Sequence, residues 1–133
     1  MAVVVGYVPT AEGRAALEQA AQECRLRNTR LIVLRSRRAG LAAADEATED
    51  AELAAVRNRL EREGLQHEVR KLVPGLEPAE DLIAVAEEVS ADMIVIGLRR
   101  RSPVGKLILG SNAQRILLDA PCPVLAVKAG GES

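Results

Sequence analysis

The sequence predicts an α/β protein in which a parallel sheet is covered by helices on both faces. Short apolar runs of strand length recur along the 133 residues, and one-faced stretches of helical length separate them. No internal repeat or low-complexity linker interrupts this alternation. Apolar strands between one-faced helices are typical of a sheet buried on both sides. With right-handed crossovers, the leading architecture is a doubly wound, three-layer α/β/α sandwich.

The first half of the chain supplies two strands and two helices. Residues 3–8 form a β-branched run that predicts a buried strand, and Thr10 is placed to cap the helix after it. That helix has a buried face at helical spacing, made of Leu17, Ala20, Ala21 and Cys24. Residues 31–34 predict a second strand. Residues 41–64 predict a long helix with a thin apolar stripe, and Gly64 is placed to end it.

The next segment supplies a weakly patterned strand and a short helix. Residues 66–73 alternate only weakly and predict an edge strand. Pro78 fits the first turn of a third helix. The predicted buried face of this helix consists of Ala79, Leu82, Ile83 and Ala86.

The last part of the chain supplies two further strands around a fourth helix. Residues 93–97 are the clearest strand of the sequence, Ser111 begins the helix, and residues 124–127 predict the fifth strand. We expect one domain over residues 1–129 and a flexible tail over residues 130–133.

The composition excludes several classes of partner. Eighteen basic and nineteen acidic residues give a net charge of −1, so the chain has no general basic field for nucleic acid. Tyr7 is the only aromatic residue and therefore the only side chain that could stack on a base. No apolar run reaches the roughly 18–20 residues that span a bilayer, and the first residues predict a strand rather than a signal peptide. We therefore expect a cytoplasmic protein without membrane or nucleic-acid partners.

Few residues are suited to catalysis or metal binding. Cys24 and Cys122 form no CxxC pair, and the single histidine, His67, cannot build a zinc site of the usual kind. Cys24 falls on a helix core face, and no lysine or arginine adjoins Cys122 to lower its pKa. We therefore expect no catalytic residue and no metal ligand, although a small hydrolase or a redox protein using Cys122 is a weaker alternative.

The long connection after the fourth strand is the strongest candidate for a binding site. It runs from residue 98 to residue 110, contains the basic run 99–101, and delivers the chain to a helix N-terminus. Glycines allow close backbone approach, and free N–H groups at a helix start suit an anion. A structural alternative is that Ser111 and Gln114 form a capping box and that the arginines are a solvated corner. No P-loop or G-x-G-x-x-G motif is present.

The C-terminal part of the chain resembles the universal stress protein family. The segments that carry the likeness are residues 91–97 (ADMIVIG), Gly110-Ser111 at a helix start, and residues 120–127 (APCPVLAV). The resemblance extends over essentially the whole chain, with a more generic first part. It implies a five-stranded parallel sheet of order 3-2-1-4-5 and a homodimer. In one subgroup it also implies ATP bound at the ends of strands 1 and 4.

Two positions depart from the nucleotide-binding pattern of that subgroup, G-x2-G-x9-G-[ST]. Gly97 matches its first glycine and Gly110-Ser111 its last positions, but Arg100 replaces the second glycine. Similar nucleotide-binding proteins carry an aspartate at the end of strand 1, where Val8 stands here. Arginine removes backbone freedom yet supplies a planar cation that can hold a phosphate bidentately. Valine accepts no hydrogen bond, so some recognition of adenosine should be lost.

The resemblance leads to two expectations about function. The first is a stress-response module that binds ATP or another adenine nucleotide without fast turnover, with Mg²⁺ present only alongside the nucleotide. The expected binding residues are Val8, Pro9, Thr10, Leu34, Gly97, Arg99, Arg100, Gly110, Ser111 and Asn112. The alternative is a dimeric stress protein that binds no nucleotide and acts through protein contacts, with the arginine connection as its docking surface.

The fifth strand gives the dimer a physical argument of its own. In the order 3-2-1-4-5 this strand lies at an edge, and it carries no charge before Lys128. An exposed apolar edge invites pairing with another strand, and a two-fold antiparallel pair closes the interface. The expected dimer contacts are Val124, Leu125, Ala126 and Val127.

Overall fold

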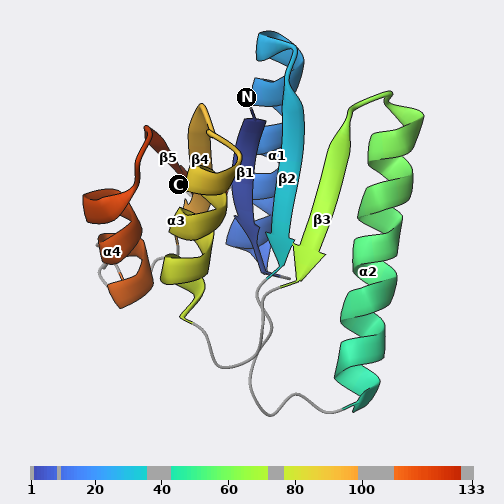
Figure 1. The fold of residues 1–133 in the computed structure, drawn as a ribbon. Helices are drawn as coiled ribbons and strands as arrows, with labels where there is room; N and C mark the ends of the chain where they lie inside the picture. The colour runs from blue at the N-terminus through green and yellow to red at the C-terminus, as the bar shows by residue number, and fades with distance from the viewer. Residues whose placement is uncertain (1, 9, 36–42, 72–76, 99–109, 130–133) are drawn as a thin grey trace.

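The computed structural model describes residues 2–8, 10–35, 43–71, 77–98 and 110–129 of the chain (Figure 1). Pro9, the connection 99–109 with Arg99 and Arg100, and the predicted tail 130–133 lie outside the described residues.

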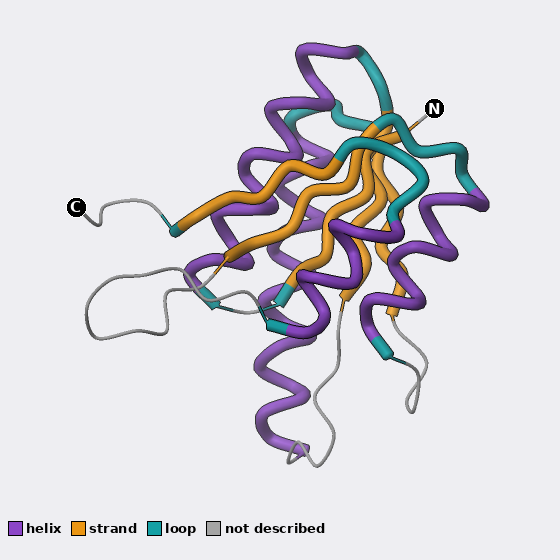
Figure 2. The backbone as a smooth tube through the Cα atoms, turned by 90° about the vertical axis from the view of Figure 1, so that its left-hand side faces the viewer, coloured by secondary structure: helices purple, strands orange, loops and turns teal. Residues whose placement is uncertain are grey.

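The architecture confirms the predicted fold class and strand order. One five-stranded parallel sheet has the order β3-β2-β1-β4-β5. Its strands are β1 (Ala2–Tyr7), β2 (Arg30–Arg35), β3 (His67–Lys71), β4 (Met93–Leu98) and β5 (Val124–Lys128). The helices are α1 (Ala11–Arg27), α2 (Ala43–Arg62), α3 (Pro78–Glu88) and α4 (Ser111–Asp119). Helices lie on both sides of the strands, with α1 behind the sheet in Figure 1 and α3 in front of it (Figures 1 and 2).

Strand residues alternate between two apolar layers because successive side chains point to opposite faces. On one face, Val3, Val5 and Tyr7 of β1 pack with residues of α1 and α2. On the other face, Ala2 and Val4 pack with residues of α3 and α4. The buried residues of the three central strands are almost all aliphatic, as the sequence indicates for a sheet covered on both sides.

The predicted ends of two helices are confirmed by their hydrogen bonds. Thr10 Oγ1 accepts from the Gly13 N–H at 3.1 Å, which makes Thr10 the N-cap of α1. Gly64 has φ +72° just after α2, and the Leu65 N–H donates to the Leu60 carbonyl at 3.1 Å. This is a Schellman arrangement, in which glycine adopts the left-handed conformation without strain.

Three local predictions are wrong in detail. Ser111 is not an N-cap: Gly110 occupies that extended position, its carbonyl accepts from the Gln114 N–H at 3.0 Å, and Ser111 is already helical. On α3, Val85 is buried while Ile83 is only half-buried, because the stripe facing the sheet follows a three-to-four-residue spacing through Val85. The first strand ends at Tyr7 rather than at residue 8.

The two edge strands differ in chemistry. β3 presents charged side chains in ion pairs: Glu68 accepts from Arg70 Nε at 2.7 Å, and Arg70 also lies 3.1 Å from Glu88 on α3. β5 consists of Val-Leu-Ala-Val before its final lysine, and Ala126 is exposed. Charges on an edge strand discourage pairing with another chain, so β3 is protected in a way that β5 is not.

Candidate functional site

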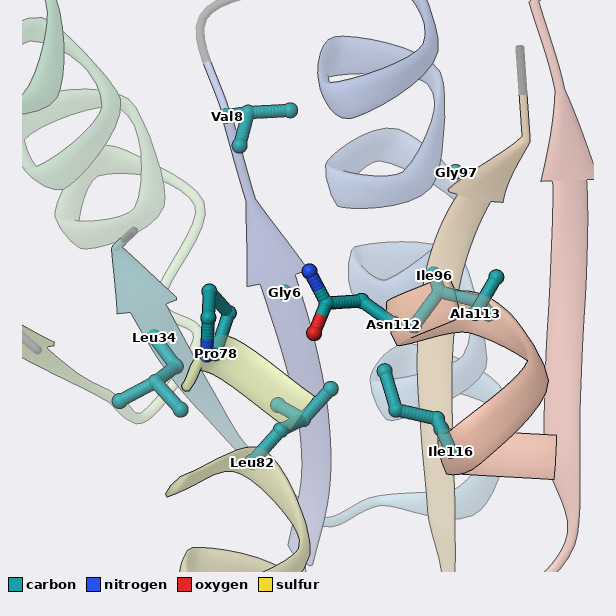
Figure 3. A pocket seen from close by; sticks show the side chains of 10 residues that line it. All are labelled: Gly6, Val8, Leu34, Pro78, Leu82, Ile96, Gly97, Asn112, Ala113 and Ile116. Carbon is teal, nitrogen blue, oxygen red and sulfur yellow. The ribbon is translucent and has the colours of Figure 1, made fainter. Parts of the chain in front are cut away.

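A cavity opens on the α3/α4 side of the sheet where β1, β2 and β4 end, and we call it the strand-end cavity (Figure 3). Its volume is about 220 Å³. It is lined by Gly6, Val8, Leu34, Pro78, Leu82, Ile96, Gly97, Asn112, Ala113 and Ile116. Ligands of open α/β sheets bind outside the carboxyl ends of the strands, where the chain order reverses. Here the reversal lies between β1 and β4, which places this cavity at the expected position.

Gly6 keeps the floor of the cavity open. A Cβ built on this residue would meet only the side chain of Leu82, at 3.5 Å, which is an ordinary van der Waals contact. A methyl group would therefore fit at this position, whereas a larger side chain would extend into the space above β1. Leu34 and Leu82 form apolar walls beside it.

Asn112 supplies the polar group of the cavity. Among the described lining residues it is the only one with a polar side chain. Figure 3 shows its carboxamide reaching from the first turn of α4 across β1, over Gly6. Within the described part of the chain, no residue donates to this carboxamide or accepts from it. Its donor and its acceptor are both available to a ligand.

Gly97 has a structural reason to be glycine. A Cβ at this position would lie 2.3 Å from the carbonyl oxygen of Glu12, closer than real Cβ contacts come. The first turn of α1 thus packs directly on the backbone of β4. The first glycine of the predicted phosphate motif is therefore required by helix packing, whether or not a ligand also approaches it.

The opposite face of the same strand ends is closed by α2. Tyr7 Oη donates to Glu52 Oε1 at 2.6 Å, and Arg14 Nε donates to the same oxygen at 3.0 Å. Arg35, which is 3% exposed, donates to Asp50, and Lys71 Nζ lies 3.5 Å from that carboxylate. We call this set of contacts the α2 clamp.

The α2 clamp stabilises both of its carboxylates in the charged form. The hydrogen bond from Tyr7, with that from Arg14, holds the pKa of Glu52 below its ordinary value. The hydrogen bond from Arg35, with the charge of Lys71, does the same for the pKa of Asp50. Tyr7, the only aromatic residue of the sequence, is buried in this clamp and does not line the strand-end cavity.

The structure gathers four of the predicted binding residues around the strand-end cavity: Val8, Leu34, Gly97 and Asn112. Gly110 and Ser111 are exposed at the start of α4, next to Asn112, and do not line it. The Thr10 side chain is engaged in capping α1. Pro9, Arg99 and Arg100 lie outside the residues that the structure describes.

Sequence reasoning missed the α3 wall and part of the floor. Pro78 and Leu82 contribute one wall, and Gly6 the floor. A signal was available: Pro78 starts the helix that follows β3, and helices that follow parallel strands begin at the carboxyl edge of the sheet. Gly6, a glycine inside a β-branched run, is the other signal, since such a residue often marks a close approach.

The described nucleophiles and titratable side chains do not line this cavity. Burial raises the pKa of Cys24 to about 11, and burial with the nearby charge of Asp92 raises that of Cys122, so neither favours a thiolate. His67 Nδ1 lies 2.9 Å from the Leu65 carbonyl, on β3. In the described ranges, no three His, Cys, Asp or Glu side chains are grouped to hold a metal ion. No helix there is long and apolar enough to cross a membrane.

Comparison with known proteins decides the family. Residues 1–128 match the model of the universal stress protein family. The chain belongs to the universal stress protein family. It is 42% identical over 135 residues to a universal stress protein of Mycolicibacterium smegmatis, covering 97% of this chain and 98% of that protein.

Solved universal stress proteins share the fold, and some of them carry nucleotides. A universal stress protein from Archaeoglobus fulgidus is 37% identical with a TM-score of 0.76, covering 96% of this chain and 98% of that one. A structure from the same organism in complex with dAMP is 32% identical with a TM-score of 0.70 and the same coverage. A universal stress protein in complex with cAMP is 26% identical with a TM-score of 0.72, covering 98% of both chains.

Proposed function

We propose that this universal stress protein is a regulatory module that binds an adenine nucleotide, ATP or a similar one, without fast turnover, in a stress response. The observation that carries the proposal is the strand-end cavity, with its apolar walls and, among its described lining, one free carboxamide. The solved relatives with dAMP and cAMP support the choice of ligand. The apolar walls Leu34, Pro78 and Leu82 suit a base or a sugar ring.

The start of α4 is the proposed position of the phosphates. The first N–H groups of a helix carry partial positive charge and favour anions. Gly110 and Ser111 are exposed there, and a Cβ on Gly110 would meet nothing within 4 Å. Arg99 and Arg100, on the connection that leads to this helix, are proposed to add charge. Mg²⁺ is proposed to enter only with the nucleotide phosphates.

The lining of the cavity supports binding rather than rapid hydrolysis. Its described side chains include no carboxylate, imidazole or thiol that could position or deprotonate a water. Transfer of a phosphoryl group depends on such positioning and on a held metal ion. We therefore propose turnover that is slow compared with release of the ligand.

Calorimetry on nucleotide-stripped protein tests this proposal with a matched pair of variants. Gly6→Val fills the floor of the cavity and should abolish the heat seen with ATP, ADP and AMP. Gly6→Ala adds only a Cβ in ordinary contact with Leu82 and should retain most of the binding. No heat from the unmodified protein at millimolar nucleotide rejects the proposal and favours the alternative, a family member that acts through protein contacts.

We also propose that two copies pair through β5. The register of β5 against β4 indicates which backbone groups of β5 face outward. The Ile94 N–H donates to the Pro123 carbonyl at 3.0 Å, and Ile94 lies opposite Val124. In a parallel ladder the residues that bond a partner strand alternate, so Leu125 and Val127 bond β4. Val124 and Ala126 therefore direct their N–H and C=O groups outward. An antiparallel pair centred on Ala126 would satisfy these groups in both copies.

Two substitutions at one position test the dimer. Ala126→Pro removes an outward N–H without touching the ladder to β4, and should convert a dimer to a monomer in light scattering after size exclusion. Ala126→Val keeps the N–H and should leave the dimer intact. A monomeric unmodified protein, or an Ala126→Pro variant that stays dimeric, contradicts pairing through this edge.

A further inference from the structure

We infer that the carboxamide of Asn112 binds the nucleoside half of the ligand and not its phosphates. This inference rests on the proposed function. It makes Asn112 a residue that determines which ligands fit, separate from the phosphate contacts expected at the start of α4.

The first argument for this inference is the position of the Asn112 side chain. Asn112 is the second residue of α4, yet Figure 3 shows its amide extended across β1 toward Pro78, over the open floor at Gly6. The exposed Asn112 thus lines the strand-end cavity, whereas its neighbour Ser111 does not. A ligand held at the helix start and extending into the cavity would bring its nucleoside, not its phosphates, under the amide.

The second argument is the chemistry of the Asn112 carboxamide and of the walls beside it. The carboxamide offers two N–H donors and one acceptor oxygen, and none of them bonds to a described residue. The walls beside it are apolar: Leu34, Pro78 and Leu82. A ligand that covers this amide without bonding it would leave a desolvated polar group unpaired, which is unfavourable. The cavity therefore selects a ligand with a donor and an acceptor at this point.

An adenine nucleoside supplies such groups. The edge of adenine presents a donor next to an acceptor, which an asparagine side chain matches with two hydrogen bonds. Ribose hydroxyls also donate and accept. A phosphate offers only acceptors, so it would use the donors of the amide and leave its oxygen unpaired.

Two neighbouring variants separate the nucleoside contact from the phosphate contact. Titrations with adenosine, AMP and ATP are measured for the unmodified protein, for Asn112→Ala and for Ser111→Ala. We expect Asn112→Ala to weaken all three ligands by a similar factor of about ten, the effect of one or two lost hydrogen bonds. We expect Ser111→Ala to weaken AMP and ATP and to leave adenosine unchanged.

The outcomes are distinguishable from failure of the proposed function. If the unmodified protein binds AMP and ATP but Asn112→Ala leaves adenosine affinity unchanged, the inference is overturned and the proposed function stands. Failure of adenosine to bind at millimolar concentration, while AMP binds, overturns it as well. If none of the three ligands binds, the proposed function itself fails. Both residues are exposed, so thermal melting should show that both variants fold.

Discussion

The carboxyl ends of β1 and β2 look very different on the two faces of the sheet. On the α1/α2 face, Tyr7 and Arg35 are buried and bonded to Glu52 and Asp50, and α2 covers them. On the α3/α4 face, their neighbours Gly6 and Leu34 border an open cavity. Residues next to each other in the sequence thus build a closed side and an open side.

This difference indicates where the molecule is free to bind. In the α2 clamp, the cationic side chains and the Tyr7 hydroxyl are paired with carboxylates of the same chain. These contacts on the closed side stabilise the fold. The open side carries a carboxamide with no partner in the described residues, over a floor without a side chain. Stability and ligand access are therefore assigned to opposite faces, and substitutions on the two faces should have separable effects.

The largest effect on stability should come from Gly97→Ala. The new Cβ would lie 2.3 Å from the Glu12 carbonyl oxygen, so α1 must move away from β4. Overpacking of this kind costs about 2–3 kcal/mol, and urea denaturation measures it. An unchanged midpoint would show that α1 does not pack on β4 as closely as the structure indicates.

Tyr7→Phe should have the next largest effect, on the closed side alone. It removes a buried hydroxyl that donates to the Glu52 carboxylate at 2.6 Å, and Arg14 remains as the partner of that carboxylate. We expect a loss of about 1–2 kcal/mol in the free energy of unfolding. Nucleotide affinity at neutral pH should not change, and a parallel loss of affinity would contradict the separation of the two faces.

Acid should reduce the stability that the α2 clamp contributes to the folded protein. The folded-state pKa values of Asp50 and Glu52 are lowered, so the stability they contribute is complete above their ordinary values of about 4. It is lost as the pH falls through the lower folded-state values. Melting temperatures measured from pH 6 down to pH 3 should therefore fall less steeply for Asp50→Asn/Glu52→Gln than for the unmodified chain. Equal slopes would assign acid sensitivity to other carboxylates.

Gly6→Ala should have the smallest effect on stability. Its Cβ would make an ordinary contact with Leu82, in contrast to the clash at Gly97. We expect a change within about 0.5 kcal/mol in urea denaturation, or a slight gain because alanine loses less backbone entropy on folding. A loss as large as that of Gly97→Ala would show that the open side is packed more tightly than its cavity indicates.

Most of the fold could be predicted because its signals are local. The β-branched run of β1 and the apolar run of β4 identify buried strands, and Thr10 and Gly64 mark helix ends by chemistry that acts within a few residues. Strand order followed from the family resemblance, not from periodicity. The capping-box alternative is wrong because the extended Gly110 occupies the N-cap position, which leaves Ser111 inside the first turn of α4.

The site could be predicted only in part because it is assembled from distant segments. Val8, Leu34 and Gly97 lie at or just after strand ends and Asn112 lies in the first turn of α4, and the family resemblance rather than a local pattern identifies these four residues. Pro78 and Leu82 line the cavity only because α3 packs over β1. No local sequence pattern predicts that packing. The packing role of Gly97 likewise depends on how closely α1 approaches β4.

The charges on β3 have a consequence for how large an assembly of this chain can become. A subunit with two adhesive sheet edges adds further subunits without limit and forms a fibre. In this chain, Glu68 and Arg70 form an ion pair, and Arg70 also pairs with Glu88 on α3. These charges on β3 disfavour the addition of another strand at that edge. If β5 pairs as proposed, growth stops at two copies, and a long-range filament is prevented by a few surface charges.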